Sequence, residues 1–120
     1  MSRPIHALIC GGHNYADHKC INSVLGQLLK TAEHGLVIIQ GGGPGAEALT
    51  REWAKANRIE YVNVPVDERR YGSLAIGIRN QRMIDGYRPH VVIAFPGSVG
   101  TADCVRRAQQ AGINVVKISI

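Results

Sequence analysis

The sequence predicts an α/β fold: one doubly wound domain that spans residues 1–120, with a five-stranded, mainly parallel sheet and helices on both of its faces. Three observations support this prediction. Short apolar runs alternate with amphipathic stretches along the whole chain, which is the pattern of parallel strands joined by crossover helices. Glycine-rich turns follow three of the runs. No linker or low-complexity segment divides the 120 residues, a length typical of a single domain.

Three of the predicted strands lie in the first half of the chain. Residues 5–10 form an apolar run, after which Asp17 is placed to cap a helix whose apolar residues recur every three or four positions as far as His34-Gly35. Residues 36–40 form the second strand. Beyond the glycine-rich residues 41–45, helical spacing resumes from Ala46 to Ala56, and residues 59–64 form the third strand.

The second half repeats the alternation. Residues 66–71 are polar, so we expect a loop there, and Leu74 to Ile84 have helical spacing. The remaining predicted elements are a strand at 90–95, a helix from about Thr101 to Ala111 and a strand at 114–120. Short, right-handed crossovers favour the strand order 3-2-1-4-5, and ligands of such sheets bind beside strands one and four, beyond their carboxyl ends.

Each glycine-rich loop connects a strand to the next helix at this rim. Glycine lets the backbone approach a ligand, and the N–H groups at a helix start favour an anion. Tight turns alone would explain any one of these loops equally well, but three at one rim favour a shared phosphate site. The loop residues expected to line it are Gly11, Gly12, His13, Tyr15, Gly41, Gly42, Gly43, Gly45, Gly97, Ser98, Val99, Gly100 and Thr101.

Known phosphate motifs narrow the choice of ligand. No GxxxxGK[ST] is present, which excludes a P-loop nucleotide hydrolase. Gly41, Gly43 and Ala46 fit GxGxx[GA], but they follow the second strand, and no acidic residue is clearly placed at the end of the next one. A conventional dinucleotide dehydrogenase is therefore poorly supported.

Composition restricts the remaining function classes. The formal charge is +5, with ten arginines among the 14 basic residues, but they form no basic stripe, and six aromatic rings give little support to a base-stacking surface. The 3 cysteines and 5 histidines have no metal-ligand spacing, so we expect reduced thiols and no metal. No signal peptide or apolar run of membrane-spanning length is evident, and we expect a cytoplasmic protein without membrane contact.

Four ordered blocks resemble the SLOG superfamily, and most closely its small YspA/cpYpsA-related members. The segment from Pro96 to Thr101 is similar to the PGGxGT signature of that superfamily. The other blocks are Cys10-Gly11-Gly12 with Tyr15 and Asp17, Gly41-Gly42 with Gly45-Ala46 and Trp53-Ala54, and Tyr71-Gly72 with Arg79-Asn80 and Met83. The resemblance implies a Rossmann-like domain that binds a nucleotide or a nucleotide derivative, with Pro96, Arg79 and Asn80 added to its binding residues.

Three functions follow as hypotheses. The first is a protein that binds a nucleotide as a sensor, a sequestering protein or a regulator. We expect no particular cofactor for it beyond this nucleotide-type ligand. The second is a hydrolase of the LOG type, which cleaves the N-glycosidic bond of a nucleoside monophosphate, with Arg79 and Asp103 as its catalytic residues. The resemblance gives this hydrolase weaker support, because Cys104 stands where the LOG enzymes have a glutamate. The third is a DNA-binding protein, as in the related DNA-processing protein A group. The relatives also imply a homodimer or a larger homo-oligomer.

Overall fold

The computed structural model describes residues 3–119, and its five strands form one sheet in which every neighbouring pair is parallel. The spatial order is β3-β2-β1-β4-β5, which confirms the predicted order 3-2-1-4-5. The strands are β1 (Ile5–Cys10), β2 (Leu36–Gln40), β3 (Glu60–Asn63), β4 (Val91–Ala94) and β5 (Asn114–Lys117). The chain reverses its winding direction between β1 and β4, as expected.

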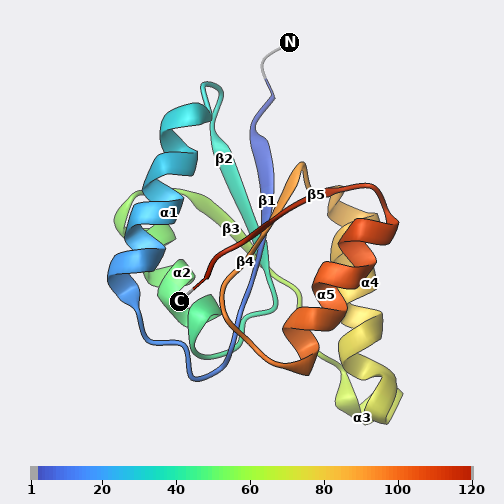
Figure 1. Cartoon of the computed structure of the whole chain (residues 1–120). Coiled ribbons are helices and arrows are strands. Elements are labelled where there is room, and N and C mark those ends of the chain that lie inside the picture. Colours follow the sequence, from blue (N-terminus) through green and yellow to red (C-terminus); the bar gives the residue numbers. More distant parts are fainter. Residues whose placement is uncertain (1–2, 120) are drawn as a thin grey trace.

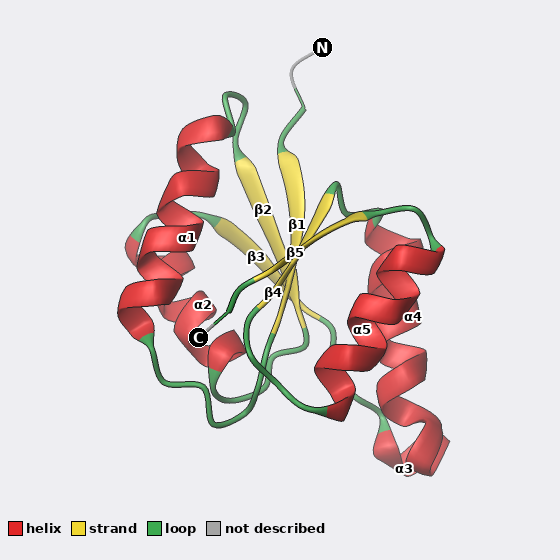
Figure 2. Cartoon of the chain, viewed as in Figure 1, coloured by secondary structure: helices red, strands yellow, loops and turns green. Residues whose placement is uncertain are grey.

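Helices cover both faces of this sheet (Figure 2). Two of them, α1 (His18–Thr31) and α2 (Ala46–Ala56), lie on one face, and α4 (Ala75–Tyr87) and α5 (Val99–Gln110) lie on the other (Figure 1). Asp17 caps α1 as predicted, because its Oδ1 accepts a hydrogen bond of 3.0 Å from the backbone N–H of Cys20. Within residues 3–119, none of the helices combines the length and the apolar character that crossing a bilayer requires.

The side chains of β1 alternate between two apolar cores, as the period of a strand requires. Ala7 and Ile9 pack with Trp53 and the apolar stripe of α1, whereas Leu8 and Cys10 pack with Met83 and the buried side of α5. Trp53 is therefore a core residue, with 7% of its surface exposed. Because both faces of β1 are buried, its carboxyl end is held in place from both sides.

Three predicted details are wrong at the element boundaries. Residues 66–71 contain the short helix α3 (Glu68–Tyr71), which Asp67 caps by accepting a bond of 3.2 Å from Arg70 N–H, and a 3-10 turn at Gly72–Leu74 follows it. Helix α5 begins two residues before the predicted Thr101, so Asp103 lies in its second turn and not beside the first N–H groups. The strand predicted at 114–120 ends at Lys117, and residue 120 lies outside the described residues.

Candidate phosphate-binding site

The loops after β1, β2 and β4 meet at the rim of the sheet that is lowest in Figure 1. Gly12 N–H donates a hydrogen bond of 2.9 Å to the carbonyl of Pro96, and its carbonyl accepts one of 3.1 Å from Ala46 N–H. Gly45 has a φ of 71°, and a Cβ at this position would overlap the backbone of Gly12 and His13. Several glycines therefore serve the close packing of one loop on another.

A small pocket of about 80 Å³ opens between these loops and the first turns of α4 and α5. Pockets for drug-sized ligands usually have about 300–1,000 Å³, so this pocket is suited to a phosphate-sized group and not to a whole nucleotide. The pocket is lined by Cys10, Gly11, His13, Glu47, Ile76, Arg79, Asn80, Met83, Ser98, Gly100 and Thr101. Seven of these residues belong to the predicted binding set, and they come from two of the three loops and from α4.

Arg79 is the cation of the pocket, and most of its hydrogen-bonding capacity is unused. Its Nε donates to Oδ1 of Asn80 at 3.0 Å and its Nη1 to the carbonyl of Val64 at 3.4 Å. No carboxylate among residues 3–119 forms an ion pair with it. The guanidinium lies against Gly41, where any Cβ would overlap it. A half-buried arginine with spare donors and no acidic partner suits a phosphate or carboxylate ligand.

The loop after β4 contributes Ser98, Gly100 and Thr101 to the lining of the same pocket. Among the described residues, none accepts a hydrogen bond from the backbone N–H groups of residues 97–101. These groups surround the start of α5, a helix of 12 residues, where unpaired N–H groups and the helix dipole attract an anion. The hydroxyl-bearing side chains of Ser98 and Thr101 line the pocket beside them.

The loop after β2 differs, because the protein itself uses its N–H groups. Glu47 is 6% exposed, and its two carboxylate oxygens accept hydrogen bonds from Gly41 N–H at 3.1 Å and from Gly43 N–H at 2.9 Å. Gly42 N–H donates to the side chain of Gln40 at 3.1 Å. An anion at this loop would have to displace a buried carboxylate, so the N–H groups available for phosphate are those of residues 97–101.

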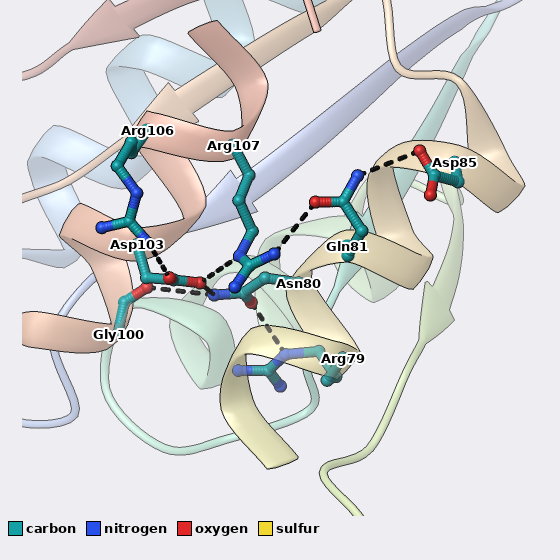
Figure 3. A network of polar contacts seen from close by, with 8 residues as sticks. All are labelled: Arg79, Asn80, Gln81, Asp85, Gly100, Asp103, Arg106 and Arg107. Carbon is teal, nitrogen blue, oxygen red and sulfur yellow. Dashed lines mark hydrogen bonds and ion pairs between the residues drawn. The ribbon is translucent and has the colours of Figure 1, made fainter. Parts of the chain in front are cut away.

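Asn80 connects Arg79 to α5 through a network of polar side chains (Figure 3). Its Nδ2 donates to the carbonyl of Gly100 at 3.2 Å and to Oδ2 of Asp103 at 3.0 Å. Asp103 also accepts hydrogen bonds from Arg106 and, at 2.8 Å, from Arg107. Asn80 is 2% exposed, and its amide is occupied on both sides, which fits a residue that positions Arg79.

Asp103 is held in its ionised form outside the pocket lining. Burial raises the pKa of this carboxyl, but the hydrogen bonds from Arg107 and Asn80, with the charges of Arg107 and Arg106, outweigh burial and lower the pKa below its ordinary value. A group with a lowered pKa is a poor proton donor near neutral pH. Asp103 therefore lies behind Asn80, which separates it from Arg79 and the pocket.

Two thiols lie close to the pocket, one in its wall and one in the core behind it. Cys10 is on its wall, and a hydrogen bond with the thiol of Cys104, together with burial, raises the pKa of Cys10. The same bond and the charge of Arg79 lower the pKa of Cys104 against the effect of burial. Cys104 is 1% exposed and belongs to the apolar core, so it occupies a core position and not a ligand-facing one.

The other predicted binding residues lie around the pocket. Tyr15 packs on the ring of Phe95 with the ring centroids 5.4 Å apart, and burial raises its pKa. Pro96 and Gly97 line an adjoining groove of about 400 Å³, which shares Ser98 and Thr101 with the pocket. The side chain of Val99 is 85% exposed. A groove of about 520 Å³ between α1 and α2 contains none of the predicted site residues.

Four lining residues, Cys10, Glu47, Ile76 and Met83, were not in the predicted binding set, and Glu47 is the charged one among them. Its signal in the sequence is weak, because an acidic residue in the first turn of a helix is also the ordinary partner of a helix dipole. Only the fold of residues 41–45 turns its carboxylate back toward Gly41 and Gly43.

Comparisons with known proteins agree with this architecture. The model of the YspA, cpYpsA-related SLOG family matches residues 6–71. Gene 61 protein of Mycobacterium phage D29 is 35% identical over an alignment of 116 residues, which covers 91% of this chain and 92% of that protein.

Two solved structures share the fold at low sequence identity. The X-ray structure of TM1055, a structural genomics target, has a TM-score of 0.71 at 20% identity and covers 92% of this chain and 72% of its own. MurG of Acinetobacter baumannii has a TM-score of 0.64 at 14% identity, and the match covers 95% of this chain but 34% of MurG. Both likenesses concern the fold alone.

Proposed function

Because this chain belongs to the YspA, cpYpsA-related SLOG family, we propose that it binds a nucleotide or a nucleotide-derived phosphorylated small molecule at the pocket beside β1 and β4, in a sensing, sequestering or regulatory role. One observation carries the proposal. Among the described residues, the backbone N–H groups of residues 97–101 have no acceptor and Arg79 has no ion-pair partner, and Arg79 lines the same small pocket at the reversal of winding as Ser98, Gly100 and Thr101. The phosphate binds there, and the rest of the ligand extends out of the pocket past His13, an exposed lining residue.

The charges in the pocket support a phosphorylated ligand over a neutral one. Arg79 has at least two N–H groups that no described residue uses, and a guanidinium binds phosphate through paired hydrogen bonds. The loop amides add donors that need no rearrangement, since the hydrogen bond from Gly12 N–H to the carbonyl of Pro96 already fixes the loop after β4 against the loop after β1. A preorganised donor set lowers the ordering cost of binding.

Titration of 15N-labelled protein with inorganic phosphate and with the four nucleoside 5′-monophosphates tests the proposal. The amide resonances of residues 97–101 are expected to shift in every titration that shows binding. Arg79→Ala is expected to weaken phosphate binding by about 10- to 100-fold, the loss expected when a hydrogen-bonded charge is removed. Arg82→Ala is the matched control, because it removes an equal charge from an exposed position of the same helix. Absence of any shift at residues 97–101 would refute the proposal.

The structure favours binding over hydrolysis of the LOG type. That reaction would use Asp103 as its acid or base, but this carboxylate does not line the pocket and is engaged by Asn80, Arg106 and Arg107. Incubation with nucleoside monophosphates is therefore expected to release no free base. Catalytic release that disappears in Arg79→Ala would show an enzyme instead of a binding protein.

A further inference from the structure

Among the described residues, Glu47 is the one carboxylate that lines the pocket, and it is buried there. More than nine-tenths of this residue is buried, although burying a charge is costly unless hydrogen bonds compensate for it. Gly41 and Gly43 supply two such bonds. The same carboxylate borders the cavity that contains Arg79, Ser98 and Thr101. The pocket lining therefore includes both a cation, Arg79, and a carboxylate, Glu47, and both lie beside Gly41.

The loop around Glu47 is fixed before any ligand arrives. Gln40, which is fully buried, donates from Nε2 to the carbonyl of Glu47 at 3.0 Å. Arg51 donates from Nη1 to Oε1 of Gln40 at 3.1 Å and to the carbonyl of Gly43 at 2.8 Å. These contacts hold both ends of the glycine-rich loop, so the carboxylate has a defined direction.

Each carboxylate oxygen of Glu47 accepts one hydrogen bond from the backbone and can accept more. A phosphate placed beside it would be repelled, so the part of the ligand nearest to Glu47 must be a hydrogen-bond donor. The pocket of about 80 Å³ accommodates only the groups close to the phosphate. In a 5′-phosphorylated ribose, the nearest donors are the sugar hydroxyls.

From this polarity we propose that Glu47 accepts hydrogen bonds from the ribose hydroxyls of the ligand, so that the site selects ribose phosphates over deoxyribose phosphates. The inference rests on the proposed function, because it assumes a phosphate at residues 97–101. It adds the sugar class of the ligand and a residue that determines it. If Glu47 only held Gly41 and Gly43 in place, the site would bind ribose phosphates and deoxyribose phosphates equally.

Sugar phosphates without a base test this selectivity, because they remove the unknown base from the experiment. The probes are inorganic phosphate, ribose 5-phosphate and 2-deoxyribose 5-phosphate, each titrated into 15N-labelled protein. Wild type is expected to bind ribose 5-phosphate on the order of 10-fold more tightly than 2-deoxyribose 5-phosphate, as expected for one hydrogen bond to a charged group. Glu47→Gln is expected to bring this ratio close to one.

Glu52→Gln is the matched control, since it removes the same charge from an exposed position of α2 that borders the groove between α1 and α2. It is expected to keep the wild-type ratio. Should Glu47→Gln not fold, the wild type alone decides: the amides of Gly41 and Gly43 should shift with ribose 5-phosphate and not with its deoxy analogue.

The outcomes separate the two proposals. Binding of all three probes without sugar discrimination, or discrimination that Glu47→Gln retains, overturns the inference and leaves the proposed function intact. Failure of every probe to shift residues 97–101 overturns both.

Discussion

Arg79 and Asn80 are neighbours in α4 whose side chains hydrogen-bond to each other, from Nε to Oδ1 at 3.0 Å. Consecutive residues of a helix point about 100° apart, so this bond requires the arginine side chain to fold back over the turn. Asn80 in turn is fixed by Gly100 and Asp103 of α5. The guanidinium at the pocket is thereby positioned relative to the amides at the start of α5.

Replacing Asn80 is expected to damage both stability and binding. Asn80→Ala leaves the Nε of Arg79 and one acceptor of Asp103 without their partner in a buried place, which costs about 1–3 kcal/mol of unfolding free energy. Urea denaturation measures this loss, and phosphate titration is expected to show weaker binding, because Arg79 loses its anchor. Gln110→Ala, an exposed change on α5, should alter neither quantity. An unchanged phosphate affinity in Asn80→Ala would show that Arg79 does not depend on this anchor.

Gly41 determines whether Arg79 can reach the pocket. A Cβ added by Gly41→Ala would overlap the guanidinium, so Arg79 must move away, and we expect phosphate affinity to fall nearly as far as in Arg79→Ala. Isothermal titration calorimetry with phosphate provides the comparison. The backbone of Gly41 does not have positive φ, so the effect is one of space and not of backbone strain.

Gly26→Ala is the control for that change. Gly26 lies inside α1, and a Cβ there meets nothing within 4 Å. Alanine in a helix interior is expected to add about 0.5–1 kcal/mol of stability and to leave phosphate binding unchanged. If Gly41→Ala behaved like Gly26→Ala, the close approach of Arg79 to Gly41 would not matter for binding.

The sequence was sufficient for the sheet and its order, because the apolar runs and the three- and four-residue spacing report directly which faces are buried. It missed α3, although Asp67 followed by Glu68 was a recognisable cap signal within a polar segment. It also missed the pairing of Asp103 with Arg106 and Arg107, which the i+3 and i+4 spacing on one helix indicates.

Which of the glycine-rich loops has unused N–H groups could not be predicted in the same way. All three have the composition of a phosphate loop, yet only the folded structure shows which N–H groups are unused. Glu47 closes the loop after β2 from the helix that follows directly, although its residue type does not single it out for this role. Pro96 accepts the N–H of Gly12 from a distant part of the chain, and this contact depends on how the loops cross at the rim, which local sequence does not encode.

Replacing Asp17 should lower the stability of the protein without changing its phosphate affinity. Its carboxylate caps α1 but does not line the pocket, so Asp17→Ala is expected to cost about 0.5–2 kcal/mol of unfolding free energy and to leave phosphate affinity at the wild-type value. Thermal unfolding and phosphate titration of the same sample measure both. A fall in affinity comparable to that of Arg79→Ala would instead connect the capped end of α1 with the site.

Asp103 should make the protein sensitive to acid. Its pKa in the folded protein is below the value of about 3.9 that an unfolded chain has, so the unfolded state binds more protons in this range. The stabilisation from its ionised form is therefore fully present above about pH 5 and is lost as pH falls through the folded pKa. In Asp103→Asn this contribution is absent, and the difference in unfolding free energy between wild type and variant should shrink between about pH 5 and pH 2. Asp85→Asn, at an exposed position of α4 whose carboxylate bonds only to Gln81 among the described residues, is the comparison. A wild-type to Asp103→Asn difference that stays constant over this range would mean that Arg106, Arg107 and Asn80 do not hold the carboxylate in its charged form.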